Sequence, residues 1–358
     1  MASGLKSAVP LSSFWSGKRV LVTGHTGFKG RWLSTWLESL GAEVLGLSLS
    51  TTQATFVQGL FPTNNDLDFD ISSAEWRDSV TSFRPEIIFH LAAQALVSEG
   101  YKDPLDTFRT NVLGSAQVLD FACTNDFVHT LVMVTTDKVY KNDESATPRI
   151  ESDLLEGSDP YSSSKVCMEF EIRSWPKAQH LEISTVRSGN VIGGGDISSH
   201  RLLPDLFRAW VANEEILLRN PNGIRPWLHV LESLGGYLEV AERNYKRTLM
   251  HSEYNFSPPL SEHATVKQIA ELAVEVLPAK TGFKIESQEN TWFKESGILL
   301  LDSSRSQSEF GWQAILTWEE SILEILQWSQ KYILGQNLRE LMQQSINWYV
   351  KKIGERNQ

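Results

Sequence analysis

Short apolar runs alternate with amphipathic stretches through the first half of the chain. The run Val20–Val22 is followed, after a glycine-rich turn, by apolar residues at spacings of three to five, as on one face of a helix. Further strands are predicted at residues 44–49, 66–71, 85–93, 130–135 and 183–188, and helices at 106–120 and from 160. Strands that alternate with helices from 19 to 188 predict an α/β fold built on a parallel, doubly wound (Rossmann) sheet.

The pattern changes after residue 195. Helical periodicity predominates, with helices predicted at 202–211, 231–244, 266–276, 319–335 and 338–350, and short strands at 216–218 and 298–301. This half shows no strand–helix alternation of its own, so we expect a smaller, mostly helical C-terminal domain that covers the substrate. The predicted boundaries place residues 14–190, with 228–256 returning, in the Rossmann domain. Residues 191–227 and 257–358 form the substrate domain.

The turn after the first strand carries Gly24, Gly27 and Gly30. Gly24 permits a tight turn, Gly27 lets the backbone approach a pyrophosphate, and Gly30 lets the helix pack close to the strand. The N-terminus of the helix then presents unpaired N–H groups to the phosphates. Strand, glycine turn and helix in this order predict a dinucleotide-binding site, and a tight turn without a ligand is the alternative.

Residues at the ends of the next strands bear on the choice of cofactor. An NAD enzyme usually places an acid at the end of the second strand for the adenosine ribose, but this chain has Ser48 and Ser50. NAD is the predicted cofactor, and NADP stays an alternative that Lys29 or Arg31 would favour. Asp70 would either meet the adenine edge or cap the following turn.

Charge and cysteine content narrow the possible partners. The net charge of −11 over 358 residues argues against nucleic acid or an anionic membrane as a partner. Cys123 and Cys167 are the only cysteines and lack metal-ligand spacing, so we expect a reducing compartment and no metal. Residues 1–13 lack the apolar core of a signal peptide, and no run approaches a membrane span. We therefore expect a cytoplasmic enzyme.

Tyr161 and Lys165 are the sharpest candidates for chemistry. Pro160 suits the first position of a helix, and residues four apart share one helix face. The reference pKa of a phenol is about 10, and an ammonium one turn away lowers it. The phenolate would take a proton from a sugar hydroxyl while hydride leaves the same carbon. Thr135 or Thr136, at the end of the preceding strand, is placed to hydrogen-bond the same oxygen.

Long stretches of the chain resemble a known family. They include Thr23-Gly-His-Thr-Gly-Phe-Lys-Gly30, Asp159-Pro-Tyr-Ser-Ser-Ser-Lys165 and residues 187–196 and 219–230. Together with Asn111 and the strand-end threonines, they resemble the extended short-chain dehydrogenases/reductases, and within these the CDP-glucose 4,6-dehydratases, over nearly the whole chain. The resemblance implies conversion of CDP-glucose to CDP-4-keto-6-deoxyglucose. C4 is oxidised by NAD, water is lost across C5 and C6, and the same hydride returns to C6.

The resemblance also implies roles for individual residues. Tyr161 would oxidise C4, Asp137 would be the acid for the leaving hydroxyl, and Lys138 would be the base at C5, which requires a depressed lysine pKa. The implied catalytic set is Thr136, Asp137, Lys138, Tyr161 and Lys165. The implied cofactor set is Gly24, Thr26, Gly27, Phe28, Lys29, Asp70, Ile71, Ala92, Ala93, Thr135, Tyr161 and Lys165. The implied substrate set is Gln94, Asn190, Arg201, Arg219, Arg225 and His229.

Structural roles and other activities of the same fold are the alternatives to these assignments. Arginine suits a diphosphate through forked hydrogen bonds, but Asn190, Arg219, Arg225 and His229 would serve equally as loop caps or surface groups. A nucleotide-sugar 4-epimerase or 4-reductase of the same fold needs Tyr161 and Lys165 but no acid and base for elimination. A non-catalytic regulator that binds NAD(P) is the alternative from another class.

The family resemblance further implies a homodimer or homotetramer. Its interface would be formed by the helix after Asp106 and the helix that carries Tyr161, both of which contain apolar and small residues. Val112, Leu113, Val118, Val166, Met168 and Phe170 are the candidates for this surface. Ordinary core packing is the alternative for them.

Overall fold

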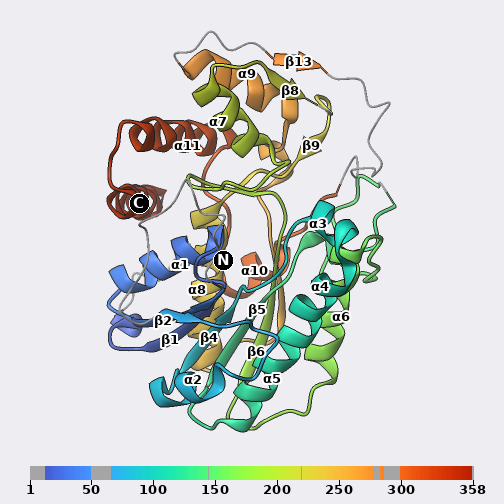
Figure 1. The fold of residues 1–358 in the computed structure, drawn as a ribbon, viewed down its shortest axis with the longest axis vertical. Coiled ribbons are helices and arrows are strands. Elements are labelled where there is room, and N and C mark those ends of the chain that lie inside the picture. Colours follow the sequence, from blue (N-terminus) through green and yellow to red (C-terminus); the bar gives the residue numbers. More distant parts are fainter. Residues whose placement is uncertain are drawn as a thin grey trace, which may run out of the picture.

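A seven-stranded parallel sheet lies between helices in the larger, lower part of the molecule in Figure 1. The computed structural model describes residues 13–49, 66–143, 145–218, 220–277, 283–285 and 299–356. The strands are β1 (Arg19–Thr23), β2 (Glu43–Ser48), β3 (Asp66–Asp68), β4 (Ile87–His90), β5 (Thr130–Val134), β6 (Glu182–Ser188) and β11 (Glu253–Phe256). They run in the order β11-β6-β5-β4-β1-β2-β3 and every pair is parallel, which confirms the predicted fold class.

Helices cover both faces of the sheet because successive strand side chains point to opposite sides. In β1, Val20 and Val22 enter one buried apolar cluster and Leu21 enters another. The first cluster is shared with α1 (Phe28–Ser39), α8 (Val230–Tyr245) and α12 (Leu338–Arg356). The second is shared with α2 (Arg77–Phe83), α5 (Gly114–Thr124) and α6 (Pro160–Ser174).

The predicted helix 106–120 is interrupted. Around it lie α3 (Val97–Lys102), α4 (Pro104–Phe108), the π-helical turn η2 (Arg109–Leu113) and α5. Buried Asn111 lies in the π turn, where its Nδ2 donates to the Gln94 carbonyl at 3.0 Å and to Ser164 Oγ at 2.8 Å. Its Oδ1 accepts from the Gln94 N–H at 2.8 Å. Both ends of the buried Asn111 amide are therefore hydrogen-bonded, and a π turn of this kind is frequent at functional sites.

A second, smaller layer lies beyond the carboxyl ends of the strands (Figure 1). Its helices α7 (Leu202–Ala212), α9 (Val266–Val276) and α11 (Trp318–Ile333) share an apolar cluster with β8 (Ile216–Leu218). The short strands are β7 (Val191–Ile192), β9 (Ile224–Arg225), β10 (Leu228–His229), β12 (Ala264–Thr265) and β13 (Phe283–Ile285). The remaining helices are η1 (Ser13–Trp15), η3 (Asp137–Val139), η4 (Leu260–Glu262) and α10 (Ser304–Phe310).

The end of the chain returns to the large sheet. Trp312 and α12 pack in the apolar cluster of α1 and α8, although the predicted boundaries assign 257–358 to the smaller domain. The predicted strand 298–301 begins outside the described residues, and within it Leu301 forms a single bridge to Arg149. Among the residues that the structure describes, no helix is long and apolar enough to cross a membrane.

Candidate active site

A cavity of about 950 Å³ lies between the sheet and the smaller layer. On one side it is lined by the carboxyl ends of β1, β4, β5 and β6, and on the other by residues of α7, β8 and β9. β1 pairs with β2 on one side and with β4 on the other, so the strand order reverses at β1. A ligand site is expected at such a reversal, and the cavity lies there.

The glycine turn forms the floor at the end of β1. Gly24 has φ of +73°, and an added Cβ would lie 2.7 Å from the Ala92 backbone nitrogen. An added Cβ at Gly30 would lie 2.1 Å from the Gly24 carbonyl oxygen. Gly27 is the N-cap of α1, and no side chain caps this helix. Free N–H groups at a helix N-terminus, in a cradle that a side chain would fill, fit the diphosphate of a dinucleotide.

Asp70 closes a turn, which is one of the two roles that the sequence left open, and its contact with the adenine edge stays a prediction. Its Oδ1 accepts from the Ser72 N–H at 2.9 Å and from Ser72 Oγ at 2.8 Å, so it closes a turn. It also lines the cavity and pairs with Arg109. Burial alone would raise the pKa of Asp70, but the hydrogen bonds from Arg109 and Ser72 outweigh it and hold that pKa below its usual range. Asp70 is therefore a fixed anion at the wall of the cavity.

The end of β5 carries a buried carboxyl group. Thr136 is the N-cap of η3, and its Oγ1 accepts from the Lys138 N–H at 3.3 Å and donates to Asp137 Oδ1 at 2.9 Å. Asp137 is 4% exposed. A Cβ added at Gly189 would lie 2.0 Å from Asp137 Oδ2, so only glycine leaves room for this carboxyl group. Burial raises the pKa of Asp137, against the opposing charge of Lys138. A carboxyl group with a raised pKa can hold a proton and donate it.

Helix α6 presents Tyr161 and Lys165 beside this carboxyl group. Asp159 Oδ1 accepts from the Ser162 N–H at 3.0 Å, and the Asp159 N–H donates to Ser162 Oγ at 3.0 Å, which fixes the start of the helix. Pro160 occupies the first turn. Tyr161 and Lys165 consequently fall on the buried face and both line the cavity.

The ionisation of this pair differs from the prediction. Burial raises the pKa of Tyr161 to about 12, although its hydrogen bond with Thr136 works in the other direction. Burial and the nearby Lys29 ammonium lower the pKa of Lys165 to about 8. Lys165 Nζ donates to the Val134 carbonyl at 3.2 Å. The predicted lowering of the Tyr161 pKa is therefore not found, because desolvation of the phenolate dominates.

Comparison with known proteins places this site in a family. Residues 20–255 match the model of the NAD dependent epimerase/dehydratase family. The chain is also 35% identical, over 94% of its length and 98% of the relative's, to CDP-glucose 4,6-dehydratase of Salmonella typhimurium. This chain belongs to the NAD-dependent epimerase/dehydratase family. This is the extended short-chain dehydrogenase/reductase family that the sequence motifs indicated.

More distant relatives agree with this assignment. The chain is 23% identical to dTDP-glucose 4,6-dehydratase of Haemophilus influenzae over 86% of its own length and 97% of that protein's. The solved structure of the epimerase Mth375 from Methanothermobacter thermautotrophicus has a TM-score of 0.80 at 21% identity, covering 93% of this chain and 97% of that one. At this identity, the structural likeness shows the fold of the epimerase/dehydratase family.

The cavity collects most of the residues singled out in the sequence. Every residue of the predicted catalytic and cofactor sets lines it. Asn190, Arg201 and Arg225 of the substrate set also line it, and Asn190 has φ of +47° at the end of β6. Arg219 lies outside the described residues. Lys138 lines the cavity with an exposed side chain.

Two residues of the predicted substrate set, His229 and Gln94, are hydrogen-bonded within the protein and do not line the cavity. His229 is fully buried, its Nδ1 accepts from the Leu231 N–H at 3.3 Å, and its Nε2 lies 3.0 Å from Glu324 Oε2. It caps α8 and does not line the cavity. Gln94 does not line the cavity either, because its Nε2 donates to Thr107 Oγ1 at 2.8 Å and its Oε1 accepts from the Leu96 N–H at 2.6 Å. Both side chains are held by contacts within the protein, and their role in binding substrate stays a prediction.

The sequence also left functional neighbours unnoticed. Lys29 Nζ donates to Tyr237 OH at 3.1 Å, and Tyr237 OH lies 2.8 Å from Ser188 Oγ, so the glycine turn is tied to α8 and β6. Gly189 makes room for Asp137. No local motif marks Ser188 or Tyr237, because the contacts join segments that are far apart in the chain. For Gly189 the signal was its place directly before Asn190 in a strand-end loop.

Replacement of Asp137 should stabilise the protein at neutral pH. A carboxyl group whose pKa is raised by folding binds protons more tightly in the native state, so the free energy of unfolding falls as pH rises from its unfolded pKa of about 3.9 through the native value. Asp137→Asn removes this loss. Urea unfolding should therefore show the variant to be more stable than the wild type at pH 7, with a difference that shrinks toward pH 4.

Asp120→Asn is the matched control for this measurement. Asp120 is partly exposed and forms an ion pair with Arg77 at 2.7 Å, so its replacement should bring no gain in stability at pH 7. An Asp137→Asn protein that is less stable than the wild type at pH 7 would contradict the burial argument.

Proposed function

We propose that this member of the epimerase/dehydratase family is a nucleotide-sugar 4,6-dehydratase that uses NAD and favours CDP-glucose. The observation that carries the proposal is the buried Asp137 carboxyl group beside Thr136 and Tyr161, because its raised pKa suits an acid that a 4-epimerase does not need. The similarity to a CDP-glucose 4,6-dehydratase over 94% of the chain supports the same reaction and the same nucleotide.

The proposed reaction begins at Tyr161. NAD⁺, when bound on the glycine turn, would accept hydride from C4 of the sugar and return it at C6. Tyr161 takes the proton of the C4 hydroxyl, and its hydrogen bond with Thr136 favours the phenolate. Lys165, one helical turn away, adds a positive charge that favours the phenolate further. These residues would produce a 4-ketone.

Elimination follows from the 4-ketone. The ketone makes the proton on C5 acidic, and Lys138 at the cavity wall is the proposed base for it. Asp137 donates its proton to the hydroxyl that leaves C6, so water is lost across C5 and C6. Asn190, Arg201 and Arg225 on the opposite wall are the proposed contacts for the diphosphate and sugar. Hydride returned to C6 and a proton returned to C5 by Lys138 would then give a 4-keto-6-deoxy sugar.

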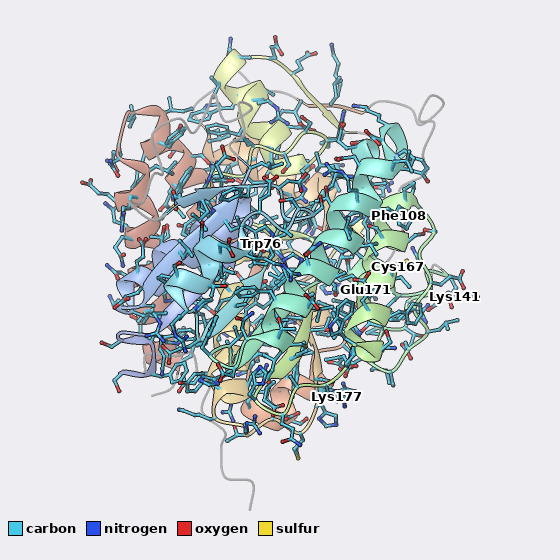
Figure 2. The ribbon with its side chains drawn as sticks, turned by 60° about the horizontal axis from the view of Figure 1, so that its bottom comes forward. Trp76, Phe108, Lys141, Cys167, Glu171 and Lys177 are labelled. Atoms are coloured by element: carbon cyan, nitrogen blue, oxygen red, sulfur yellow. The ribbon has the colours of Figure 1, made fainter. Side chains whose placement is uncertain are left out.

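A homo-oligomer is the proposed assembly, and one face of the sheet layer supports it. Val118, Val166 and Met168 of the predicted interface are core residues, but Leu113 and Phe170 are 47% and 52% exposed. Figure 2 shows Phe108, Cys167 and Glu171 on the helices of this face. Burial raises the pKa of Glu171 to about 7, and among the described residues its buried Oε2 has no hydrogen-bond partner. An apolar face with an unsatisfied acceptor suits a second copy of the chain.

Turnover of a substrate panel tests the proposed function. With NAD⁺, the protein should convert CDP-glucose to a product lighter by one water, faster than the dTDP-, GDP- or UDP-hexoses, and NADP⁺ should support slower turnover. Deuterium placed at C4 should be recovered at C6 of the same sugar. An unchanged mass with an altered sugar would indicate a 4-epimerase, and no turnover with a bound cofactor would indicate a regulator.

Two substitutions should separate oxidation from elimination. Tyr161→Phe removes the base, so no 4-ketone should form. Asp137→Asn retains shape but loses the acid, so elimination should fall by about 10²–10⁴-fold while the C4 ketone still forms and keeps its C6 oxygen. Mass spectrometry of the sugar nucleotide after borohydride reduction distinguishes these products. Dehydration by Asp137→Asn at the wild-type rate would rule out the assigned acid.

Charges on the proposed interface should separate the subunits. Leu113→Glu combined with Phe170→Glu places carboxylates on the exposed apolar face, and burying them between two copies would be costly. Light scattering at micromolar concentration should show an oligomer for the wild type and a monomer for the variant. Leu334→Glu, at an exposed site after α11, should leave the oligomer intact. A monomeric wild-type protein would refute the proposed assembly.

A further inference from the structure

A fully buried ion pair lies directly beneath the proposed catalytic residues. Arg187 of β6 and Glu169 of α6 are 0% and 1% exposed. Arg187 Nε donates to Glu169 Oε1 at 2.8 Å, and Arg187 Nη2 donates to Glu169 Oε2 at 2.7 Å. This is a bidentate contact in which the guanidinium engages both carboxylate oxygens. The proposed mechanism does not use either residue.

Glu169 would otherwise be the natural partner of Lys165. The two residues are four apart on α6, so they share the same buried helix face. Glu169 Oε1 instead accepts a further hydrogen bond from Thr135 Oγ1 at 2.7 Å. Lys165 Nζ donates to the Val134 carbonyl at 3.2 Å and lies 3.6 Å from Met168 Sδ. The carboxylate is thus drawn toward β5 and β6 and not toward the lysine.

Arg187 is itself held firmly in this position. Its Nη1 donates to Tyr140 OH at 2.6 Å and to the Glu151 carbonyl at 3.3 Å. Tyr140 OH in turn donates to Asn255 Oδ1 at 2.8 Å. These partners come from separate segments of the chain. The guanidinium therefore cannot follow the Glu169 carboxylate if it moves toward Lys165. The geometry therefore fixes Glu169 from the side of β6.

Stability alone does not explain such a pair. Taking two charges out of water is costly, and apolar replacements of similar volume are often neutral or stabilising. The position of the pair is more informative. It connects Thr135, next to the proposed catalytic Thr136, with the helix that carries Lys165.

We propose that Arg187 is a positioning residue that holds the Glu169 carboxylate on Thr135 and away from the Lys165 ammonium. The charge of Lys165 then acts on the Tyr161 phenol instead of being neutralised within the helix. This inference rests on the proposed role of Tyr161 as the base. Among the described residues, the side chain of Arg187 hydrogen-bonds to Glu169, Tyr140 and Glu151, so it would act on Tyr161 through Glu169 and Lys165.

Other charged groups also act on this pair. Lys29 faces Lys165 from α1, and the charge of Asp137 acts on Tyr161 from η3. His90 of β4 is near Lys165 but is fully buried between Thr23 and Ser115, and burial lowers the pKa of its ring to about 3, so it is neutral. Arg201 favours the Tyr161 phenolate more strongly than Asp137 opposes it, and Asp159 opposes it more weakly than either acts. None of these groups changes when Arg187 and Glu169 are replaced.

A cycle of three variants tests the inference through the acidic limb of the pH profile of kcat/KM. Arg187→Met frees an uncompensated carboxylate beside Lys165, which disfavours the phenolate, so the limb should move to higher pH by about 1–3 units. Glu169→Gln leaves an extra positive charge, and the limb should move to lower pH. The double variant Arg187→Met/Glu169→Gln restores neutrality, and its amide oxygen still accepts from Thr135. Its limb should return to the wild-type position.

The same cycle shows what would overturn the inference. A merely structural pair predicts that the double variant is impaired at least as much as Arg187→Met, with an unmoved limb, and this result would refute the proposal. If Arg187→Met does not fold, the comparison of Glu169→Gln with the double variant still decides, because a limb at the same pH in both also refutes it. Arg243→Met, in an ion pair with Glu239 on α8, should leave the limb in place.

A second measurement separates this inference from the proposed function. The phenolate of Tyr161 is observed by ultraviolet difference titration of the NAD-loaded protein, with Tyr161→Phe as the blank, and this needs no turnover. Its midpoint should rise in Arg187→Met and return in the double variant even if no nucleotide sugar is dehydrated. An unmoved midpoint would refute the role of Arg187, whereas a moved midpoint without dehydration would refute only the proposed reaction.

Discussion

The site depends on the close approach of three backbone segments at the end of β1. These are the turn at Gly24, the first turn of α1 at Gly30 and the end of β4 at Ala92. Neither Gly24 nor Gly30 has space for a Cβ, because the end of β4 and the turn itself occupy that space. Only with this contact can α1 begin directly behind β1 and direct its free N–H groups into the cavity. The reversal of strand order at β1 then makes the carboxyl ends of β4, β5 and β6 the remaining walls.

Burial shifts the pKa values of the titratable groups in those walls. It raises the pKa of both Asp137 and Tyr161 and lowers that of Lys165, so each group is biased toward its neutral form. For Asp137 this bias suits an acid. For Tyr161 it opposes the role of a base, so neighbouring hydrogen bonds and positive charges must compensate. The same low-polarity environment thus favours one proposed step and makes the other depend on the electrostatics around Lys165.

The polar network around Glu169 and Arg187 therefore bears on the proposed ionisation of Tyr161 as well as on packing. Glu169 and Arg187 are buried together, and their hydrogen bonds extend to Thr135 and Tyr140 on the segment that carries Asp137. Lys29 reaches from the glycine turn to Tyr237 on α8. Each of these contacts joins an element on one side of the cavity to another, so the catalytic segments are held relative to each other by polar side chains and not by apolar packing alone.

The sequence by itself determined the class of the fold, the glycine turn and the Tyr161/Lys165 pair. These are local signals, because periodicity, glycine spacing and a helix start at Pro160 operate within a few residues along the chain. The sequence predicted one helix over 106–120, and the π turn at Arg109–Leu113 was not visible, since a helical period is preserved on both sides.

Only the tertiary structure decided which polar residues face the cavity. His229 and Gln94 are as polar as Asn190 and Arg225, but they hydrogen-bond with Glu324 and Thr107 and do not line the cavity. The burial of Asp137, the exposure of Lys138 and the pairing of Glu169 with Arg187 rather than Lys165 are likewise invisible along the chain. The physical reason is that pKa values and hydrogen-bond partners depend on distances between segments, and packing of the whole sheet sets those distances.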